Sequence, residues 1–448
     1  MNYLMRLLCI WFTKTLGFFC RLIGHNGTNA AGKIVVRLYP EILTDLSKQI
    51  REKIIAVCGT NGKTTTNNLI YKTLTDSGKS VVCNNLGANM IEGVIVAFIN
   101  KADIFGRLNA DFACIEIDEG YAVRVFDYMK PDIVLLTNLF RDQLDRYGEI
   151  DITAEKLDSA FKKLSNTTLL LNADDPLCVQ FSKKESLPMK FFGIDCDLGI
   201  ESDETKEGRF CPVCGKQLEY DRYYYSQLGI YRCPNCDFGR PKPDFEAANI
   251  HFENGLEFEI ADTHVSLNYR GLYNIYNVLA AFSVFDICGL DKKKFSEILK
   301  TYKPQVGRME EFKISGKTVV LNLSKNPAGF NQAISTVLLD KSDKDAVIVI
   351  NDGLQDGTDV SWLWDVDFEK LSADSVKNII TSGIRCRDMY LRLKYSDMEN
   401  IENNPDVKSA ICELIKTENR ILYVLVNYTA LFPTHKILTE LSESEELK

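Results

Sequence analysis

The sequence has little histidine and no excess of positive charge. Its formal net charge is −9, which argues against a protein built mainly to coat nucleic acid, because such binding neutralises phosphates with lysine and arginine. The sequence also contains no internal repeat and no low-complexity tract. No nucleophilic Cys-His arrangement is evident, since none of the four histidines lies in a recognisable catalytic motif, namely His25, His251, His264 and His435.

A long uninterrupted apolar run is also missing. The first residues, MNYLMRLLCIWFTKTLGFFCRLIG, are apolar but are interrupted by Arg6, Lys14 and Arg21, so no stretch approaches the ~20 apolar residues of a membrane-spanning helix. No small-residue cleavage site of a signal peptide stands out. We expect a helix that packs on the protein or on a partner. The alternative is an amphipathic helix that rests on the inner face of a membrane.

The composition is that of a soluble globular protein. Hydrophobic residues make up 45% and charged residues 26% of the 448 residues, a length that exceeds one ordinary core and predicts two or three domains. Ten of the 14 cysteines are scattered singly, as reduced thiols are. We therefore expect a cytoplasmic protein.

Short apolar runs alternate with helical patterns along the chain. Strands are predicted near Val57, Val82, Ile115, Leu135 and Leu170, with helices between them, a pattern typical of a doubly wound α/β domain. A second α/β block follows Gly307. We predict a helical lead-in segment over residues 1–45, a central domain over 46–304 and a smaller α/β C-terminal domain over 305–448. A small module is inserted into the central domain over residues 205–240, where the composition changes to Cys, Pro, Gly and Tyr.

A phosphate-binding loop is predicted at GTNGKT, residues 59–64, between an apolar strand and a helix. Backbone N–H groups, the Lys63 ammonium and the positive end of the next helix would surround the phosphates, and Thr64 would bind Mg²⁺. The strict Walker pattern requires a further glycine where this chain has Val57. A chance Gly-Lys-Thr turn is the alternative.

Two carboxylates, Glu116 and Asp118, end the strand DFACIEID. The carboxyl ends of strands in an open parallel sheet are where ligands bind, so either group can hold Mg²⁺. Taken alone, an acidic strand end is more often simply solvated.

Four cysteines form two C-x-x-C pairs, Cys211 with Cys214 and Cys233 with Cys236. This spacing is typical of a zinc ribbon with one structural Zn²⁺, since four thiolates leave no position for water. The alternatives to a zinc site are a redox-active cysteine pair and chance clustering. The Tyr- and Arg-containing linker also allows a base-stacking role, although its tyrosines would ordinarily build the core of the ribbon.

A loop with Asp352, Asp356 and Asp359 follows the apolar run AVIVI in the last domain. Such loops often carry functional groups. For any single aspartate, making the turn or capping the next helix is the more ordinary role.

Five motifs, taken in order, resemble those of the Mur ligases, the ATP-dependent enzymes that build the peptide of bacterial cell-wall precursors. They are GTNGKTT at 59–65, TNLFRDQLDRYGE at 137–149, LNADDP at 171–176, GLYNIYNVLAA at 271–281 and GRME at 307–310. The resemblance implies a Mur ligase-like central P-loop domain with an inserted zinc ribbon. It also implies ATP and Mg²⁺ binding by Gly59, Thr60, Asn61, Gly62, Lys63, Thr64, Thr65, Glu116, Asn138, Asp142, Asn274 and Arg308.

Departures from the family pattern are informative. Gln143 and Tyr273 stand where the family usually has histidine, and the Asp-Asn-Pro-Arg signature that helps to hold an incoming amino acid is not found in the last domain. The NNLGANM segment at 84–90, the four-cysteine module and the last domain look like one branch of the family. In that branch a ligase subunit amidates the α-carboxylate of D-glutamate in lipid II through an acyl phosphate, during peptidoglycan biosynthesis.

The branch implies a heterodimer with a class I glutamine amidotransferase-like glutaminase, which releases ammonia from glutamine. It further implies that one aspartate of the last domain orients the catalytic histidine of that partner, with Asp359 as first choice and Asp356 as second. A stand-alone Mur-type or folylpolyglutamate-type amino-acid ligase is the alternative enzyme. A regulated nucleic-acid-binding module is the alternative from another class.

Overall fold

The computed structural model describes residues 2–22, 28–84, 88–141, 150–198, 208–251, 255–267, 271–302, 306–353 and 355–446. These residues fall into two compact units, each of which is described by itself. The first unit contains the elements from α1 to α11, and the second contains those from β12 to α15.

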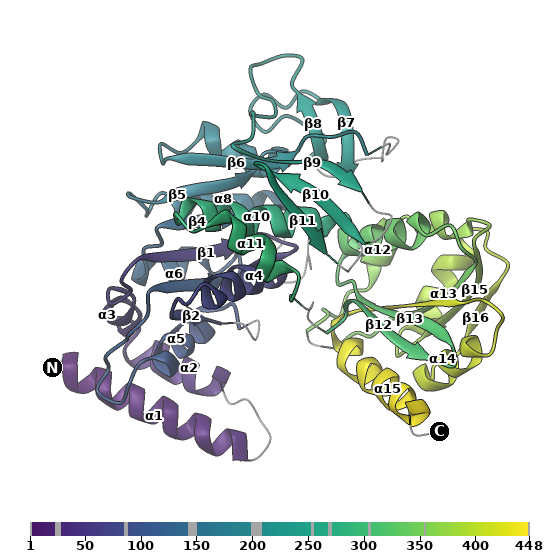
Figure 1. Ribbon diagram of the computed structural model, residues 1–448, viewed down its shortest axis with the longest axis horizontal. Helices are drawn as coiled ribbons and strands as arrows, with labels where there is room; N and C mark the ends of the chain where they lie inside the picture. Colours follow the sequence, from purple (N-terminus) through teal and green to yellow (C-terminus); the bar gives the residue numbers. More distant parts are fainter. Residues whose placement is uncertain are drawn as a thin grey trace. The chain divides into compact units, whose positions relative to one another are not determined.

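The first unit is built on a nine-stranded sheet in the order β11-β10-β9-β6-β5-β4-β1-β3-β2 (Figure 1). The six strands from β6 to β2 pair in parallel, and β9 continues this parallel arrangement. The last hairpin, β10–β11, adds two antiparallel strands. The strands are β1 (Lys53–Cys58), β2 (Val81–Cys83), β3 (Phe112–Glu116), β4 (Ile133–Leu136), β5 (Thr168–Asn172), β6 (Met189–Ile194), β9 (Phe245–His251), β10 (Leu256–Ile260) and β11 (Thr263–Leu267).

The central strands are apolar on both faces, because helices cover both sides of a parallel sheet. Every residue of β3 and β4 is buried. α10, which carries the Asn-x-x-Asn motif, is buried along most of its length. The helices are α4 (Lys63–Asp76), α5 (Ile91–Lys101), α6 (Ala122–Tyr128), α8 (Ile150–Phe161), α9 (Pro176–Val179), α10 (Tyr273–Ile287) and α11 (Lys292–Leu299).

Three helices precede the sheet: α1 (Asn2–Leu22), α2 (Thr28–Leu38) and α3 (Ile42–Ser47). Their inward residues, including Ile10, Val35 and Ile42, join the same hydrophobic core as β1 and β3. The expected packing of the first helix on the protein is thus present on one of its faces. Among the described residues, the window Tyr3–Cys20 of α1 is the one stretch long and apolar enough to cross a membrane by length and composition, and 22% of it is buried.

The predicted insertion lies between β6 and β9. It forms the antiparallel hairpin of β7 (Glu219–Tyr225) and β8 (Leu228–Arg232), flanked by the two C-x-x-C turns. Its small core contains Leu218, Tyr231 and Phe238 together with Cys211 and Cys233.

The second unit contains a six-stranded sheet in the order β12-β13-β17-β14-β15-β16. β12 and β13 are antiparallel, and the other neighbouring strands are parallel. The strands are β12 (Arg308–Ile314), β13 (Lys317–Leu323), β14 (Lys344–Val349), β15 (Val376–Ser382), β16 (Ile401–Asn403) and β17 (Ile421–Val426). The helices are α12 (Pro327–Leu339), α13 (Cys386–Lys394), α14 (Val407–Ile415) and α15 (Tyr428–Glu446), with 3₁₀ helices η2 (Ser361–Asp365) and η3 (Phe368–Ser372). The predicted α/β fold class is confirmed for both units.

Candidate nucleotide site and four-cysteine cluster

The predicted phosphate loop connects β1, which lies between β4 and β3 in the first sheet, to α4. Its two glycines have positive φ angles, 120° at Gly59 and 81° at Gly62, a region that L side chains rarely adopt. A Cβ on Gly59 would lie 2.2 Å from the Thr137 hydroxyl oxygen, and a Cβ on Gly62 would lie 2.2 Å from Oδ1 of Asn277. Both glycines are therefore required by the backbone angle and by close neighbours.

The segment after β4 holds this loop in shape. Asn138 accepts from the Asn61 N–H through Oδ1 (2.9 Å) and donates to the Asn61 carbonyl through Nδ2 (3.1 Å), while its own carbonyl accepts from the Thr60 N–H (2.9 Å). Thr137 donates a further bond to the Asn61 carbonyl at 2.8 Å. Asn138, which we predicted as a nucleotide-site residue, is thus placed at the loop as one of its supports.

Lys63 opens α4, and its ammonium folds back over the loop. Nζ donates to the carbonyls of Gly59 and Thr60 and lies 3.1 Å from Oε2 of Glu119. Lys63 and Glu119 are both buried. Thr64 follows and is half-buried, and Thr65 is buried. The Lys63 ammonium is therefore held between the loop carbonyls and the Glu119 carboxylate.

Glu116 ends β3, the neighbour of β1, and is 2% exposed. Two asparagines from the NNLGANM segment position it. Asn84 bonds to the Glu116 backbone on both sides, at 2.9 and 2.8 Å, and Asn89 donates to Oε1 at 3.0 Å. The other oxygen, Oε2, is buried and has no hydrogen-bond partner among the described residues.

A buried carboxylate oxygen without a donor is costly, and a divalent cation is a partner of the right chemistry. Mg²⁺ takes oxygen ligands, often one or two carboxylates plus substrate phosphates. Glu116 and the Thr64 hydroxyl would hold the ion, with Asp118 close in sequence. Asp118 uses its Oδ1 to accept from the Gly120 N–H at 3.0 Å, which shapes the turn after β3.

The start of α10, more than 200 residues further along the chain, contacts the residues that follow the loop. Asn277 accepts from the Thr66 hydroxyl at 3.3 Å and donates to Oδ1 of Asn274 at 3.2 Å. Asn274 and Asn277 are both buried. Asn277 thus contacts Thr66 directly after the loop, and the predicted residue Asn274 lies beside Asn277.

The LNADDP segment after β5 carries two buried aspartates. Asp174 forms an ion pair with Arg240 at 2.6 Å and accepts from the Tyr276 hydroxyl at 2.8 Å. Asp175 accepts from the N–H groups of Leu139 and Leu177 and so caps α9. Burial raises the pKa of Asp175 to about 6, even though these N–H donors act to lower it.

The inserted hairpin packs directly on this segment. Gln227 donates to the Leu139 carbonyl at 2.7 Å, the Gly229 N–H to the Asp174 carbonyl at 2.9 Å, and the Tyr231 hydroxyl to the Ala173 carbonyl at 3.2 Å. Two of these bonds reach the LNADDP segment, and the third reaches Leu139 in the segment after β4.

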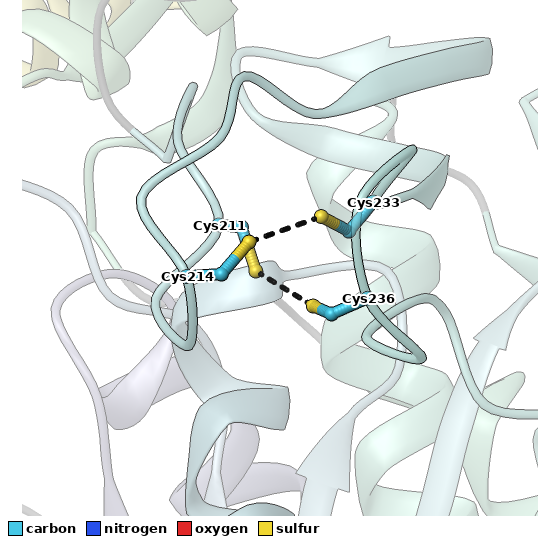
Figure 2. A group of neighbouring side chains, drawn as sticks. All are labelled: Cys211, Cys214, Cys233 and Cys236. Atoms are coloured by element: carbon cyan, nitrogen blue, oxygen red, sulfur yellow. Dashed lines mark hydrogen bonds between the residues drawn. The ribbon is translucent and has the colours of Figure 1, made fainter.

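The four cysteines of the insertion point toward one another from two tight turns (Figure 2). The sulfur atoms of Cys211 and Cys236 are 3.6 Å apart, those of Cys214 and Cys233 are 3.5 Å apart, and all four lie within 4.8 Å of one another. A tetrahedral Zn²⁺ with ~2.3 Å Zn–S bonds requires S–S separations of about 3.8 Å. The cluster therefore fits one structural zinc ion.

One of the four donors is already biased toward the form that binds metal. The backbone N–H of Lys216 and the Asn235 side chain lower the pKa of Cys214 to about 6, which favours the thiolate that binds metal. Of the five tyrosines in the linker, Tyr224, Tyr225 and Tyr231 are buried. These tyrosines build the ribbon core and its contact with the sheet.

The acidic loop of the second unit follows β14, and its aspartates differ in environment. Asp356 is 7% exposed and accepts from both the N–H and the hydroxyl of Thr429, which caps α15. Asp352 pairs with Arg385 at 2.8 Å. Asp359 is exposed and accepts from the Ser361 N–H at 2.8 Å, an interaction that lowers its pKa.

Two further residues predicted for the nucleotide site are Arg308 and Asp142. Arg308 starts β12 of the second unit, opposite Asn322 of β13. Asp142 and Gln143 lie outside the described residues. Two residues at the loop were not predicted, Glu119 and Asn277. Glu119 directly follows the strand DFACIEID, and Asn277 belongs to the motif GLYNIYNVLAA.

Two family models match the chain. Residues 57–221 match the Mur ligase middle domain and residues 323–431 match the MurT ligase C-terminal domain. The Mur ligase family implies the use of ATP. Among solved structures, a pseudomurein peptide ligase type C from Methanothermus fervidus superposes with a TM-score of 0.71 at 25% identity, covering 87% of this chain and 79% of that one. The MurF ligase from Thermotoga maritima in complex with ADP has a TM-score of 0.65 at 15% identity, covering 93% and 84%, and shows the fold alone.

Similarity to curated proteins extends over almost the whole length. The chain is 36% identical over 428 residues, 95% of each chain, to the lipid II isoglutaminyl synthase (glutamine-hydrolyzing) subunit MurT of Staphylococcus aureus strain COL. It is 32% identical over 419 residues, 92% of each, to the protein of the same name from Streptococcus pneumoniae. The chain therefore belongs to the MurT subunits, a branch of the Mur ligase family.

Proposed function

We propose that this protein is the ATP-using subunit of a lipid II isoglutaminyl synthase, which amidates the α-carboxylate of D-glutamate in the stem peptide of lipid II during peptidoglycan biosynthesis. The observation that carries the proposal is the phosphate loop with a buried lysine and an orphaned carboxylate, in a chain that is 36% identical to a subunit of that name over 95% of its length.

Activation of the carboxylate comes first. A carboxylate is a poor acyl donor, so one of its oxygens attacks the γ-phosphorus of ATP, and ADP leaves with the electrons of the broken P–O bond. The Lys63 ammonium and the loop N–H groups stabilise the charge on the transferring phosphoryl group. Glu116 and Thr64 would hold Mg²⁺, which would supply positive charge against the phosphates.

Ammonia then attacks the acyl phosphate. The new C–N bond forms, inorganic phosphate leaves with one of the original carboxylate oxygens, and a proton is lost from nitrogen. Because ammonia is small and carries no carboxylate, the site requires no group to grip a second carboxylate. The absence of the Asp-Asn-Pro-Arg signature from the last domain agrees with ammonia as the nucleophile.

The ammonia is supplied by a glutaminase partner of the class I amidotransferase type, in a heterodimer. In this chain, Asp359 would orient the histidine of the partner's Cys-His pair, which fixes the tautomer and stabilises the imidazolium. Exposure favours Asp359 over Asp356, because both oxygens of Asp356 are already occupied by Thr429.

The test is amidation of purified lipid II by the chain, with ATP and either ammonium or glutamine, with and without the glutaminase. The expected result is product from ammonium with the chain alone and product from glutamine only when the partner is present. An ATP-dependent product that requires a free amino acid, with no amidation from either nitrogen source, would instead support a stand-alone ligase.

A further inference from the structure

α1 presents apolar side chains on the face that does not pack on the protein. Leu4 is 63% exposed, and Leu8, Trp11 and Phe12 are also exposed. Their spacing of four, seven and eight residues from Leu4 places them on one side of a helix. Phe18 and Phe19 continue the same side about two turns further, with 57% and 56% exposure.

The opposite face fixes α1 to the first unit. Cys9, Ile10 and Thr13 are buried on this face. Trp11, whose side chain is otherwise exposed, donates through its indole to the Ile104 carbonyl at 2.8 Å, and the Lys14 ammonium donates to the Asn100 carbonyl at 3.2 Å. Both of these faces of α1 are therefore apolar, and the protein covers only one of them.

Neighbouring segments extend the exposed apolar surface. Ile104 and Phe105, beside Trp11, are each 55% exposed. α2 packs against α1 and exposes Ile34 and Leu38. Soluble monomers rarely leave contiguous apolar patches of this kind uncovered unless the patch is an interaction site.

The charge around this surface identifies its occupant. Residues 1–40 contain five of the 53 basic residues and none of the 62 acidic residues of a chain whose net charge is −9. Lys33 and Arg37 are exposed on α2 beside Ile34 and Leu38. An apolar face accompanied by cations in an otherwise acidic protein complements an anionic lipid surface.

We propose that α1, with the exposed residues of α2 and the Ile104–Phe105 turn, docks this protein on the surface of an anionic lipid bilayer. α1 lies in the plane of the membrane and does not cross it, because Cys9, Ile10 and Thr13 are buried in the protein and Arg6 and Lys14 interrupt the apolar window. Its apolar side chains enter the boundary between headgroups and acyl chains, to a depth of about 5–10 Å.

The use of this surface rests on the proposed function, since lipid II is a membrane lipid and a docked enzyme would meet it in two dimensions. The docking itself does not depend on catalysis. Vesicle binding and amidation are therefore measured separately, so that failure of one is distinguishable from failure of the other.

The experiment is flotation of the full chain, with its glutaminase partner, on vesicles of phosphatidylcholine alone or of phosphatidylcholine and phosphatidylglycerol in equal parts. Binding is expected on the anionic vesicles and is expected to weaken with salt. The variant Leu8→Glu/Phe19→Glu should bind at least tenfold more weakly. A matched variant that places the same charges on exposed apolar residues elsewhere, Ile152→Glu/Leu339→Glu, should bind like the wild type.

Folding of each variant is checked by its thermal unfolding midpoint and its ATP affinity, which should be unchanged. A second variant, Lys33→Gln/Arg37→Gln, should lose the preference for anionic vesicles while keeping a folded α1. Equal flotation of wild type and Leu8→Glu/Phe19→Glu, or no flotation of the wild type at low salt, would overturn the proposal. So would a wild-type dimer in solution that the Leu8→Glu/Phe19→Glu variant dissociates, because the face would then belong to a second copy of this chain.

Discussion

The Nζ atom of Lys63 lies 3.1 Å from Oε2 of Glu119, and both side chains are more than 90% buried. Lys63 also donates to two loop carbonyls. The Glu119 carboxylate is thus a counter-ion of the Lys63 ammonium. We expect the phosphates of bound ATP to take over this role, so that nucleotide binding exchanges the partners of the lysine.

Replacing Glu119 by Gln should destabilise the nucleotide-free protein, because the buried ammonium keeps its carbonyl contacts but loses its charged partner. A loss of about 1.5–3 kcal/mol is expected for a hydrogen bond to a charged group. Saturating ATP should remove most of this difference, since phosphate replaces the carboxylate. Calorimetric unfolding with and without ATP measures both quantities.

The control for this prediction is the exposed pair of Lys72 and Asp76 on the same helix, at 2.6 Å. Asp76→Asn should change stability by no more than about 0.5 kcal/mol, with or without ATP, because exposed pairs contribute little. An equal loss in Glu119→Gln with and without ATP would contradict the exchange of partners.

Glu116 should determine the Mg²⁺ requirement. Glu116→Gln keeps the size of the side chain and the contact to Asn89 but removes the negative charge at the orphaned oxygen. The Mg²⁺ concentration for half-maximal amidation should rise on the order of tenfold, equivalent to about 1.4 kcal/mol, whereas binding of metal-free ATP should not weaken. An unchanged Mg²⁺ titration would remove Glu116 from the metal site.

The two candidate aspartates of the second unit should separate by phenotype. Asp359→Asn should lower glutamine hydrolysis by the complex on the order of 10²- to 10⁴-fold, as expected when an imidazole loses its orienting carboxylate, without lowering stability or ammonium-driven amidation. Asp356→Asn should instead lower the unfolding midpoint, because it weakens the cap on Thr429. Undiminished glutamine hydrolysis in Asp359→Asn would exclude its proposed role.

Removal of metal from the four-cysteine cluster should weaken nucleotide binding. The hairpin that the cluster closes is bonded to the carbonyls of Leu139, Ala173 and Asp174. Leu139 directly follows Asn138, which supports the phosphate loop, so loosening the hairpin should disturb that loop. Chelation is expected to raise the Kd for ATP roughly 3- to 10-fold, about the free energy of one hydrogen bond. Equilibrium binding before and after chelation, with zinc content measured in parallel, is the assay.

A variant tests the same contact with the metal in place. Tyr231→Phe removes the hydroxyl that reaches Ala173 and should raise the Kd for ATP in the same direction, while zinc content stays at one ion per chain. Asp221→Asn, on the exposed side of β7, should have no effect. ATP binding that is indifferent to both chelation and Tyr231→Phe would show that the ribbon does not support the nucleotide site.

Features of contiguous residues were predictable from the sequence. The loop from Gly59 to Thr65 and the two C-x-x-C pairs carry their geometry in local spacing, and the strands around them followed from apolar runs in a parallel sheet. The order of the five motifs along the chain resembled that of the Mur ligases, which supported the same fold. For these reasons the fold class and the four-cysteine cluster were predicted as they occur.

Contacts between distant segments were not predictable in this way. Glu119 and Asn277 meet the loop across 56 and 211 residues of chain, respectively, and no local pattern encodes such distances. Asp356 and Asp359 looked alike in the sequence, and only the approach of Thr429 from α15 buries the first and leaves the second exposed. The first helix was expected to pack on the protein, with docking on a membrane as the alternative. One face of α1 is buried in the protein, and the other is exposed and apolar.

The central claim, that this chain activates the carboxylate of lipid II as an acyl phosphate, is tested most directly by oxygen-18. Lipid II labelled with ¹⁸O in the α-carboxylate of D-glutamate is amidated by the chain with ATP and ammonium, and the inorganic phosphate is analysed by mass spectrometry. We predict one ¹⁸O atom in each phosphate released with ADP, and no label transfer with Lys63→Ala. Amide formation with unlabelled phosphate, or with label in AMP, would contradict the account.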